Sequence, residues 1–379
     1  MKKTDVKIPV AIQLVLDDIG WFWGRDERDQ GHPSRTGLPR WHVVEDYMMV
    51  DAVGRAINQK INTMFVIGEW DRNNVLRKVP YSNKFGKDWD SSKWLNLEEA
   101  EKIRDFMNSC EYIELGYHGL LHGLWEENGT HITETEFFAP EDFKKGSKPF
   151  KLLPESMLRQ HFDAFLEIYN DWGFNHKLRT FASPCGNMGA EKTDEFTKVL
   201  KDYGVKFWHN NGIKNCIVQT GIICNAKAIE IVPWESYDID PEILPTYDPE
   251  KAGILGGHWP NLLRYNPKKN FERVEAWKSF FDRQSEVFGM IISRDMEFAH
   301  YQQLHKFYGE VEEENGMIKI DLTKVDDMAP EKNKDFYISI KNGNEPTECI
   351  GGKITLYETK KDFKNYKIER TEGSVIYIK

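Results

Sequence analysis

Short apolar runs alternate with amphipathic segments from residue 10 to about residue 300. Five segments carry apolar residues at intervals of three and four, which predicts helices. They are Val43–Lys60, Leu97–Ser109, Glu155–Trp172, Glu191–Tyr203 and Phe271–Arg283. Between them, apolar runs predict seven strands, at Val10–Leu16, Thr63–Gly68, Tyr112–Gly116, Thr180–Ser183, Val205–Trp208, Ile229–Val232 and Gly253–Gly256. This alternation is typical of a parallel α/β barrel or open sheet.

The pattern changes after residue 309. An acidic stretch, Glu310–Glu314, precedes short β-rich runs that Asn-Gly, Gly-Gly and Glu-Gly turns separate. We therefore predict two units: a barrel over residues 1–309 and a small, sandwich-like all-β domain over residues 310–379. Two polar insertions, Asp71–Asn96 and Glu126–Lys151, are expected to form loops at the mouth of the barrel. The predicted C-terminal strands are Met317–Leu322, Asp335–Ile340, Lys353–Glu358 and Ser374–Ile378.

Composition and charge narrow the class of function. The 379 residues are 40% hydrophobic, which excludes a disordered chain. Acidic residues outnumber basic ones by 61 to 51, and the resulting net charge of −10 disfavours binding to nucleic acid. The 12 Trp, 15 Tyr and 22 Phe could line a site for sugars or other flat ligands, but they could equally fill the core.

Cysteine usage and the length of the apolar runs bear on the compartment. The five cysteines include no CxxC pair, so they indicate no cysteine metal site, and their odd number argues against a secreted disulfide framework. The apolar run Ile8–Leu16 is too short to span a bilayer, and it ends in two aspartates rather than at a cleavage site. We therefore expect a cytoplasmic protein without a transmembrane segment, although a chain whose leader had been removed would look the same. The oligomeric state is not specified.

Three groups of ionisable residues follow predicted strands. Asp17 and Asp18 close the first strand, where α/β proteins build their sites, although one of them could instead cap a helix. His118 and His122 are four residues apart, a spacing that places both rings on one side of a helical turn, as chelation requires. An isolated pair of this kind is a loose pattern. His258 follows Gly256 and Gly257, and two glycines in a row suggest that another group of the protein or a ligand approaches the backbone closely here.

Together, six motifs resemble the ordered series of the polysaccharide deacetylase (NodB-homology) superfamily, similar to carbohydrate esterase family four. The resemblance covers about residues 8 to 300, and each motif lies at the end of a predicted strand. The motifs are LDDIG (16–20), NTMFVIG (62–68), GYHGLLH (116–122), FASPCG (181–186), YGVKFW (203–208) and ILGGH (254–258).

The resemblance implies a deformed (β/α) barrel of about seven strands with an Asp-His-His metal site. Carried over by position, Asp18, His118 and His122 would bind the metal, Asp17 would be the general base and His258 the general acid. One carboxylate and two imidazoles suit zinc, and the same donor set accepts cobalt, nickel or iron.

The activity implied by the resemblance is removal of an N-acyl group, most simply acetyl, from an amino sugar in a polysaccharide or glycan precursor. Pro184 and Cys185 would contact the substrate, and a backbone N–H near Cys185 would hold the oxyanion. Aromatic residues next to the motifs are expected to bind the sugar, with packing of the loops as the alternative. These residues are Trp21, Trp23, Tyr117, Trp125 and Trp259.

The third motif departs from the family pattern, which has an arginine where this chain has Ala182. Arg179 is three residues away, an odd offset that points to the opposite face of a strand. Arg25 or Arg264 could reach in from loops. Two alternatives therefore stay open: a carbohydrate-binding relative with weakened catalysis, and a metal-dependent hydrolase of another C–N or glycosidic bond.

Overall fold

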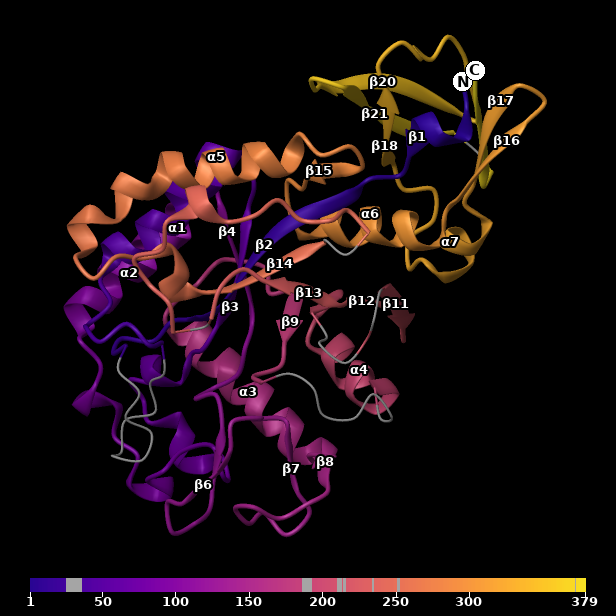
Figure 1. The fold of residues 1–379 in the computed structure, drawn as a ribbon. Helices are drawn as coiled ribbons and strands as arrows, with labels where there is room; N and C mark the ends of the chain where they lie inside the picture. Colours follow the sequence, from indigo (N-terminus) through magenta and orange to yellow (C-terminus); the bar gives the residue numbers. More distant parts are fainter. Residues whose placement is uncertain are drawn as a thin grey trace.

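The computed structural model describes residues 1–24, 36–185, 193–209, 213, 216–233, 235–250, 253–371 and 373–379. A mostly parallel sheet forms the centre of the molecule (Figure 1), in the order β11-β12-β10-β9-β4-β3-β2-β14-β13, and β15 pairs with the start of β2. Only the β11–β12 pair is antiparallel among these pairings. The strands are β2 (Val10–Ile19), β3 (Ile61–Phe65), β4 (Ile113–Tyr117), β9 (Thr180–Ala182), β10 (Phe207–His209), β11 (Cys216–Gln219), β12 (Ile222–Asn225), β13 (Lys227–Glu230), β14 (Ile254–His258) and β15 (Met290–Ile292).

The protein is therefore a mixed α/β structure, as predicted. Closure into a barrel is not confirmed, because the pairings of the described strands follow an open path from β11 to β13. All ten residues of β2 are buried, which explains its nearly continuous apolar sequence: strands of a parallel sheet are covered on both faces.

Helices flank this sheet. The helices α1, α2 and α5 pack together, and α3 contacts α4 (Figure 1). Capping follows the sequence: the Asn96 side chain accepts a hydrogen bond from the N–H of Glu99 at the start of α2, and Asn58 ends α1 in the left-handed conformation. The helices are α1 (Val44–Ile57), α2 (Leu97–Ser109), α3 (Glu155–Asp171), α4 (Thr193–Asp202), α5 (Val274–Ser285), α6 (Met296–Tyr308) and α7 (Thr323–Met328). Across the residues that the structure describes, no helix combines the length and apolar character needed to cross a membrane.

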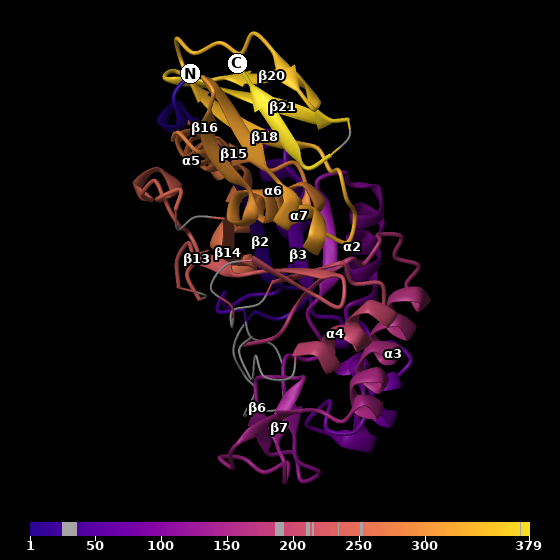
Figure 2. The same cartoon turned by 90° about the vertical axis from the view of Figure 1, so that its right-hand side faces the viewer.

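The C-terminal residues form two four-stranded sheets, β1-β18-β21-β20 and β16-β17-β22-β19. Strand β1 comes from the N-terminus and pairs antiparallel with β18, so both termini lie in this part of the molecule (Figures 1 and 2). The division at residue 309 into separately folding units stays a prediction. The strands are β1 (Val6–Lys7), β16 (Glu310–Glu314), β17 (Met317–Asp321), β18 (Phe336–Lys341), β19 (Cys349–Ile350), β20 (Gly352–Thr359), β21 (Phe363–Arg370) and β22 (Val375–Ile378).

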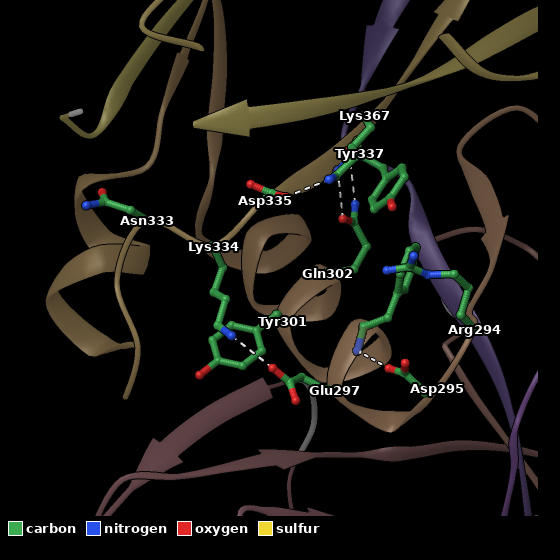
Figure 3. Close-up of a pocket in the computed structure, with 11 residues that line it drawn as sticks. Arg294, Asp295, Glu297, Tyr301, Gln302, Asn333, Lys334, Asp335, Tyr337 and Lys367 are labelled. Carbon is green, nitrogen blue, oxygen red and sulfur yellow. Dashed lines mark hydrogen bonds and ion pairs between the residues drawn. The ribbon is translucent and has the colours of Figure 1, made fainter. Parts of the chain in front are cut away.

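Helix α6 joins the central sheet to the C-terminal sheets, and its pattern did not predict a helix. Nine of its thirteen residues are buried, among them Gln302, Gln303, His300 and His305, so no polar face marks it as amphipathic. The Gln302 amide exchanges hydrogen bonds with the backbone of Tyr337 in β18. Beside this contact lies a cavity of about 400 Å³, shown in Figure 3, whose charged residues include the ion pair Lys334–Glu297.

Each predicted strand and helix overlaps an observed one, but several elements were missed. The acidic stretch 310–314 is strand β16, whose side chains are largely exposed. The two polar insertions contain short 3₁₀ helices and two hairpins rather than loops alone. The hairpins pair β5 (Leu124–Trp125) with β6 (His131–Thr133) and β7 (Phe138–Pro140) with β8 (Phe150–Leu152).

Candidate metal centre

A β-bulge places the two aspartates at the end of β2. Leu16 pairs with Thr63 and Ile19 with Phe65, so β2 has one residue more than β3 across this interval. Asp18 takes up the irregularity with a φ of 68°. Bulges re-aim side chains that would otherwise alternate between the two faces of a sheet. Asp17 and Asp18 are therefore part of the strand, rather than residues that follow it.

Gly20 closes this segment, and its place could not be taken by another residue. Its φ is 114°, and a Cβ built on it would lie 2.3 Å from the carbonyl oxygen of Val66. The glycine therefore lets β2 leave the sheet against the loop that follows β3.

The histidine pair follows β4, but it does not lie on a helical turn as the spacing predicted. Residues 118–123 form an irregular bend, and His122 has a φ of 55°. The buried carboxylate of Glu136 accepts hydrogen bonds from the N–H groups of Leu120, Leu121 and His122, at 2.8, 3.3 and 3.2 Å. Oε2 of Glu136 thus accepts hydrogen bonds from three backbone N–H groups of the bend. His161 Nδ1 lies 3.0 Å from the other carboxylate oxygen, Oε1.

The bend brings both imidazoles to Asp18. Asp18 Oδ1 lies 3.4 Å from His118 Nε2 and 3.4 Å from His122 Nε2, and all three side chains are buried. The Nδ1–H of His118 donates to the carbonyl oxygen of Ala182 at 2.8 Å. Because a carbonyl can only accept, neutral His118 presents the lone pair of Nε2 to Asp18.

The electrostatics of this group favour a positive charge at its centre. Burial alone would raise the pKa of Asp18, but the nearby His122, His118 and His258 hold it well below its usual range. Burial alone would lower the pKa of His118, but Asp17 and Asp18 raise it. The two carboxylates therefore draw a proton to the imidazole, and a bound cation would satisfy the same attraction.

The three residues fit a divalent metal ion. Asp18 Oδ1 and His118 Nε2 are buried and make no hydrogen bond to any described residue. Ligand atoms at zinc–ligand distances of about 2.0–2.2 Å lie roughly 3.3–3.6 Å apart in a tetrahedral site, and the observed 3.4 Å falls in this range. A group of one carboxylate oxygen and two imidazole nitrogens leaves room for water or substrate on the ion.

Asp17 and His258 flank this group. They are directly paired on the adjacent parallel strands β2 and β14. The backbone N–H of His258 donates to Asn261 Oδ1 at 2.7 Å, and Asn261 in turn donates to the carbonyl oxygen of Ser236. These bonds fix the end of β14, where His258 is partly exposed. Asp17, its neighbour on β2, is buried.

Most of the aromatic residues predicted to bind a substrate are buried in the core. Trp21, Tyr117, Trp125 and Trp259 are each at most 2% exposed. Only Trp23 among them is partly exposed, and its ring lies 5.1 Å from that of Trp41, which is 48% exposed. These two tryptophans therefore supply the accessible aromatic surface after β2.

The segment that follows β9 carries the other predicted site residues. Pro184 is buried, and Cys185 is exposed with a φ of 48°. Arg179, which directly precedes β9, forms ion pairs with Glu114 and Glu297.

Two other arginines, Arg25 and Arg264, could replace the one missing at Ala182, and the structure describes one of them. Arg264 forms ion pairs with Asp238 and Glu272. Arg25 lies outside the described residues.

Two carboxylates of the site were missed because they lie in a segment interpreted as a loop. Glu134 and Glu136 follow β6, within residues 126–151. The signal available was Phe137 and Phe138 directly after Glu136, since a carboxylate beside two large apolar residues is carried into the core.

Comparisons with known proteins leave the family open. No protein-family profile matches the chain, and no curated protein sequence matches it. Among solved structures, it is similar to a 4-α-glucanotransferase from Thermococcus litoralis, with a TM-score of 0.38 and 10% identity. That match covers 75% of this chain and 39% of the other, so the chain spans about two fifths of the glucanotransferase.

It is also similar to a protein from Mycobacterium smegmatis assigned as a polysaccharide deacetylase, with a TM-score of 0.39 and 12% identity. That match covers 75% of this chain and 86% of the other. Likeness at this level assigns neither a family nor an activity, and the proposals below rest on the geometry of the site.

Proposed function

We propose that this protein is a metal-dependent hydrolase that removes an N-acyl group, most simply acetyl, from an amino sugar in a polysaccharide or glycan precursor. The observation that carries the proposal is Asp18 Oδ1 at 3.4 Å from the Nε2 atoms of both His118 and His122, with Asp17 and His258 beside them. The deformed barrel and the separate C-terminal β domain implied by the sequence are part of the same proposal.

Asp18, His118 and His122 would hold the ion, with zinc as the first choice. A divalent ion in such a site acidifies water and polarises an acyl oxygen. Around it, Asp17 would accept the proton of the attacking water, as a positioned carboxylate does in general base catalysis. A backbone N–H beside Cys185 would donate to the oxygen that becomes negatively charged.

His258 would deliver a proton to the departing amine nitrogen. Its place opposite Asp17 in the β2–β14 pair allows the proton acceptor and the proton donor to face the same acyl group. The hydrogen bond from its backbone to Asn261 keeps the end of β14 in place. With this division of roles, both proton transfers would be performed by groups on adjacent strands.

A sugar substrate is supported by charge and by one aromatic surface. The net charge of −10 is compatible with a neutral glycan. Trp41, beside Trp23, offers an exposed ring on which a sugar could stack.

The test combines metal analysis with product release. We expect purified wild-type protein to carry close to one divalent ion per chain and to release acetate from N-acetylated oligosaccharides. Asp18→Asn should no longer bind the ion. Asp17→Asn should bind the ion but release no acetate. Wild-type protein without a stoichiometric divalent ion would refute the proposal.

A second candidate function is carbohydrate binding without turnover. Ala182 supplies no charge at the position of the family's arginine, and Arg179 is engaged by Glu114 and Glu297. Glycan binding by the metal-loaded protein without any product would favour this function.

A third candidate is hydrolysis of another C–N or glycosidic bond by the same residues. Mass spectrometry of the products separates it from deacylation, because glycosidic cleavage creates a reducing end and releases no acetate.

A further inference from the structure

A second set of potential metal ligands adjoins the Asp18 group. His122, Glu134 and Cys185 each offer one ligand atom, and these three atoms lie within 4.8 Å of one another. His122 is the residue that the two groups share. The other two come from segments far apart in sequence: Glu134 follows β6, and Cys185 follows β9.

The thiol and the carboxylate face each other directly. Cys185 Sγ donates a hydrogen bond to Glu134 Oε2 at 2.9 Å, and Cys185 is not part of a disulfide. Cys185 has a φ of 48°, in the left-handed region that residues other than glycine rarely adopt. The backbone is thus held in an unusual conformation at the residue whose thiol meets Glu134.

Glu134 is in turn linked to the bend that carries His122. Two residues further on, Glu136 accepts the backbone N–H of His122 at 3.2 Å. The segment 134–136 therefore places one carboxylate behind the histidine bend and the other beside Cys185. Residues 134–136 therefore contact both other members of the group, through hydrogen bonds from the His122 backbone and from the Cys185 thiol.

We propose that Cys185, Glu134 and His122 form a second cation-binding position that takes a thiophilic divalent ion such as zinc or cadmium. Sulfur, nitrogen and carboxylate oxygen are the donor set that zinc-type ions bind, and hard ions such as magnesium do not favour sulfur. On binding, the thiol proton is released to solvent and a metal–thiolate bond forms. The position does not depend on hydrolysis of an amide, because it uses only His122 from the proposed catalytic group.

Cadmium is a suitable probe for this position, because a cadmium–thiolate bond produces an ultraviolet charge-transfer band. Carboxylate and imidazole ligands produce no such band. Titration of the full-length apo-protein with cadmium should produce the band in the wild type. The band should be lost in Cys185→Ser, since serine keeps the size of the side chain and removes the sulfur. Cys110→Ser and Cys349→Ser are the matched controls, because both cysteines are partly buried and neither belongs to the group.

Two further variants locate the other ligands. Glu134→Gln should weaken cadmium binding about tenfold or more while leaving the band at saturation. Asp18→Asn should retain the band, because Asp18 is not a member of this group. Circular dichroism of each variant establishes that it is folded.

A band of wild-type intensity in folded Cys185→Ser, or no band in the wild type, overturns the proposal. So does a band that vanishes in folded Asp18→Asn. None of these results bears on acetate release, so failure of this site and failure of the proposed hydrolase activity are distinguishable.

Discussion

Glu136 Oε2 accepts the backbone N–H of His122 at 3.2 Å, and through this contact a buried carboxylate holds a residue of the proposed metal site. The same side chain accepts the N–H groups of Leu120 and Leu121 and contacts His161. The bend that carries the two histidines is therefore built around Glu136, rather than by helical hydrogen bonds.

Glu136→Gln should destabilise the protein and weaken metal binding together. The amide NH₂ of glutamine would face backbone N–H donors, so the free energy of unfolding should fall by about 1–3 kcal/mol. Metal affinity should fall about 10- to 100-fold, because the ligand His122 loses its orientation. Chemical denaturation and zinc titration measure the two effects, and Glu127→Gln on the exposed surface should change neither.

Gly119→Ala should disturb the same bend by another route. A Cβ at Gly119 would lie 2.4 Å from Glu136 Oε2, and the residue has a φ of 103°. The matched control is Gly146→Ala, where φ is 81° and a Cβ would meet nothing within 4 Å. We expect Gly119→Ala to lose about 1–3 kcal/mol more of the free energy of unfolding than Gly146→Ala does. Equal losses would mean that the contact with Glu136 does not constrain the bend.

The stability of the protein should fall as pH rises, because of Glu69. Burial raises the pKa of Glu69 to about 8, although hydrogen bonds from the backbone N–H groups of Phe22 and Trp23 partly oppose the shift. Between its ordinary pKa of 4.5 and about 8, the folded state holds this proton more tightly than the unfolded state does. The free energy of unfolding should therefore decrease across this window by about 5 kcal/mol from this group alone.

Glu69→Gln removes the ionisation and should flatten that part of the pH profile, with a gain in stability over the wild type at pH 8. Denaturant titrations at several pH values measure it, with Glu127→Gln as the control. A wild-type slope in Glu69→Gln would contradict the assigned pKa.

Removal of residues 310–379 should destabilise the remaining chain. One apolar cluster joins Val6, Ile8 and Tyr301 to Ile318 and Ile338 across the proposed boundary. Uncovering three such side chains costs about 5 kcal/mol, which is comparable with the whole stability of many domains. We expect a fragment of residues 1–309 to melt at a lower temperature than the full chain or to aggregate. A fragment with the melting temperature of the full chain would show that the C-terminal sheets are an independent unit.

The local pattern of the sequence determined the elements whose burial is visible in a short window. Continuous apolar runs predicted β2, β3, β4 and β14, and regular three- and four-residue spacing predicted α2 and α5. Helix α6 escaped because its buried positions include glutamine and histidine, whose partners lie in other elements. Exposed β16 escaped because its five residues are four glutamates and one valine, which form no apolar run.

For the site, the local sequence pattern was enough to place five residues at strand ends, because motif and strand boundary are both local properties. They are Asp17, Asp18, His118, His122 and His258. Three other features became visible only in the folded chain: a bulge turns Asp18 to the histidines, Glu136 rather than a helix shapes their bend, and Cys185 contacts Glu134. These contacts join residues between about 14 and 100 positions apart. No local pattern encodes such pairings, because they arise only when the strands are placed side by side and burial forces each polar group to find a partner.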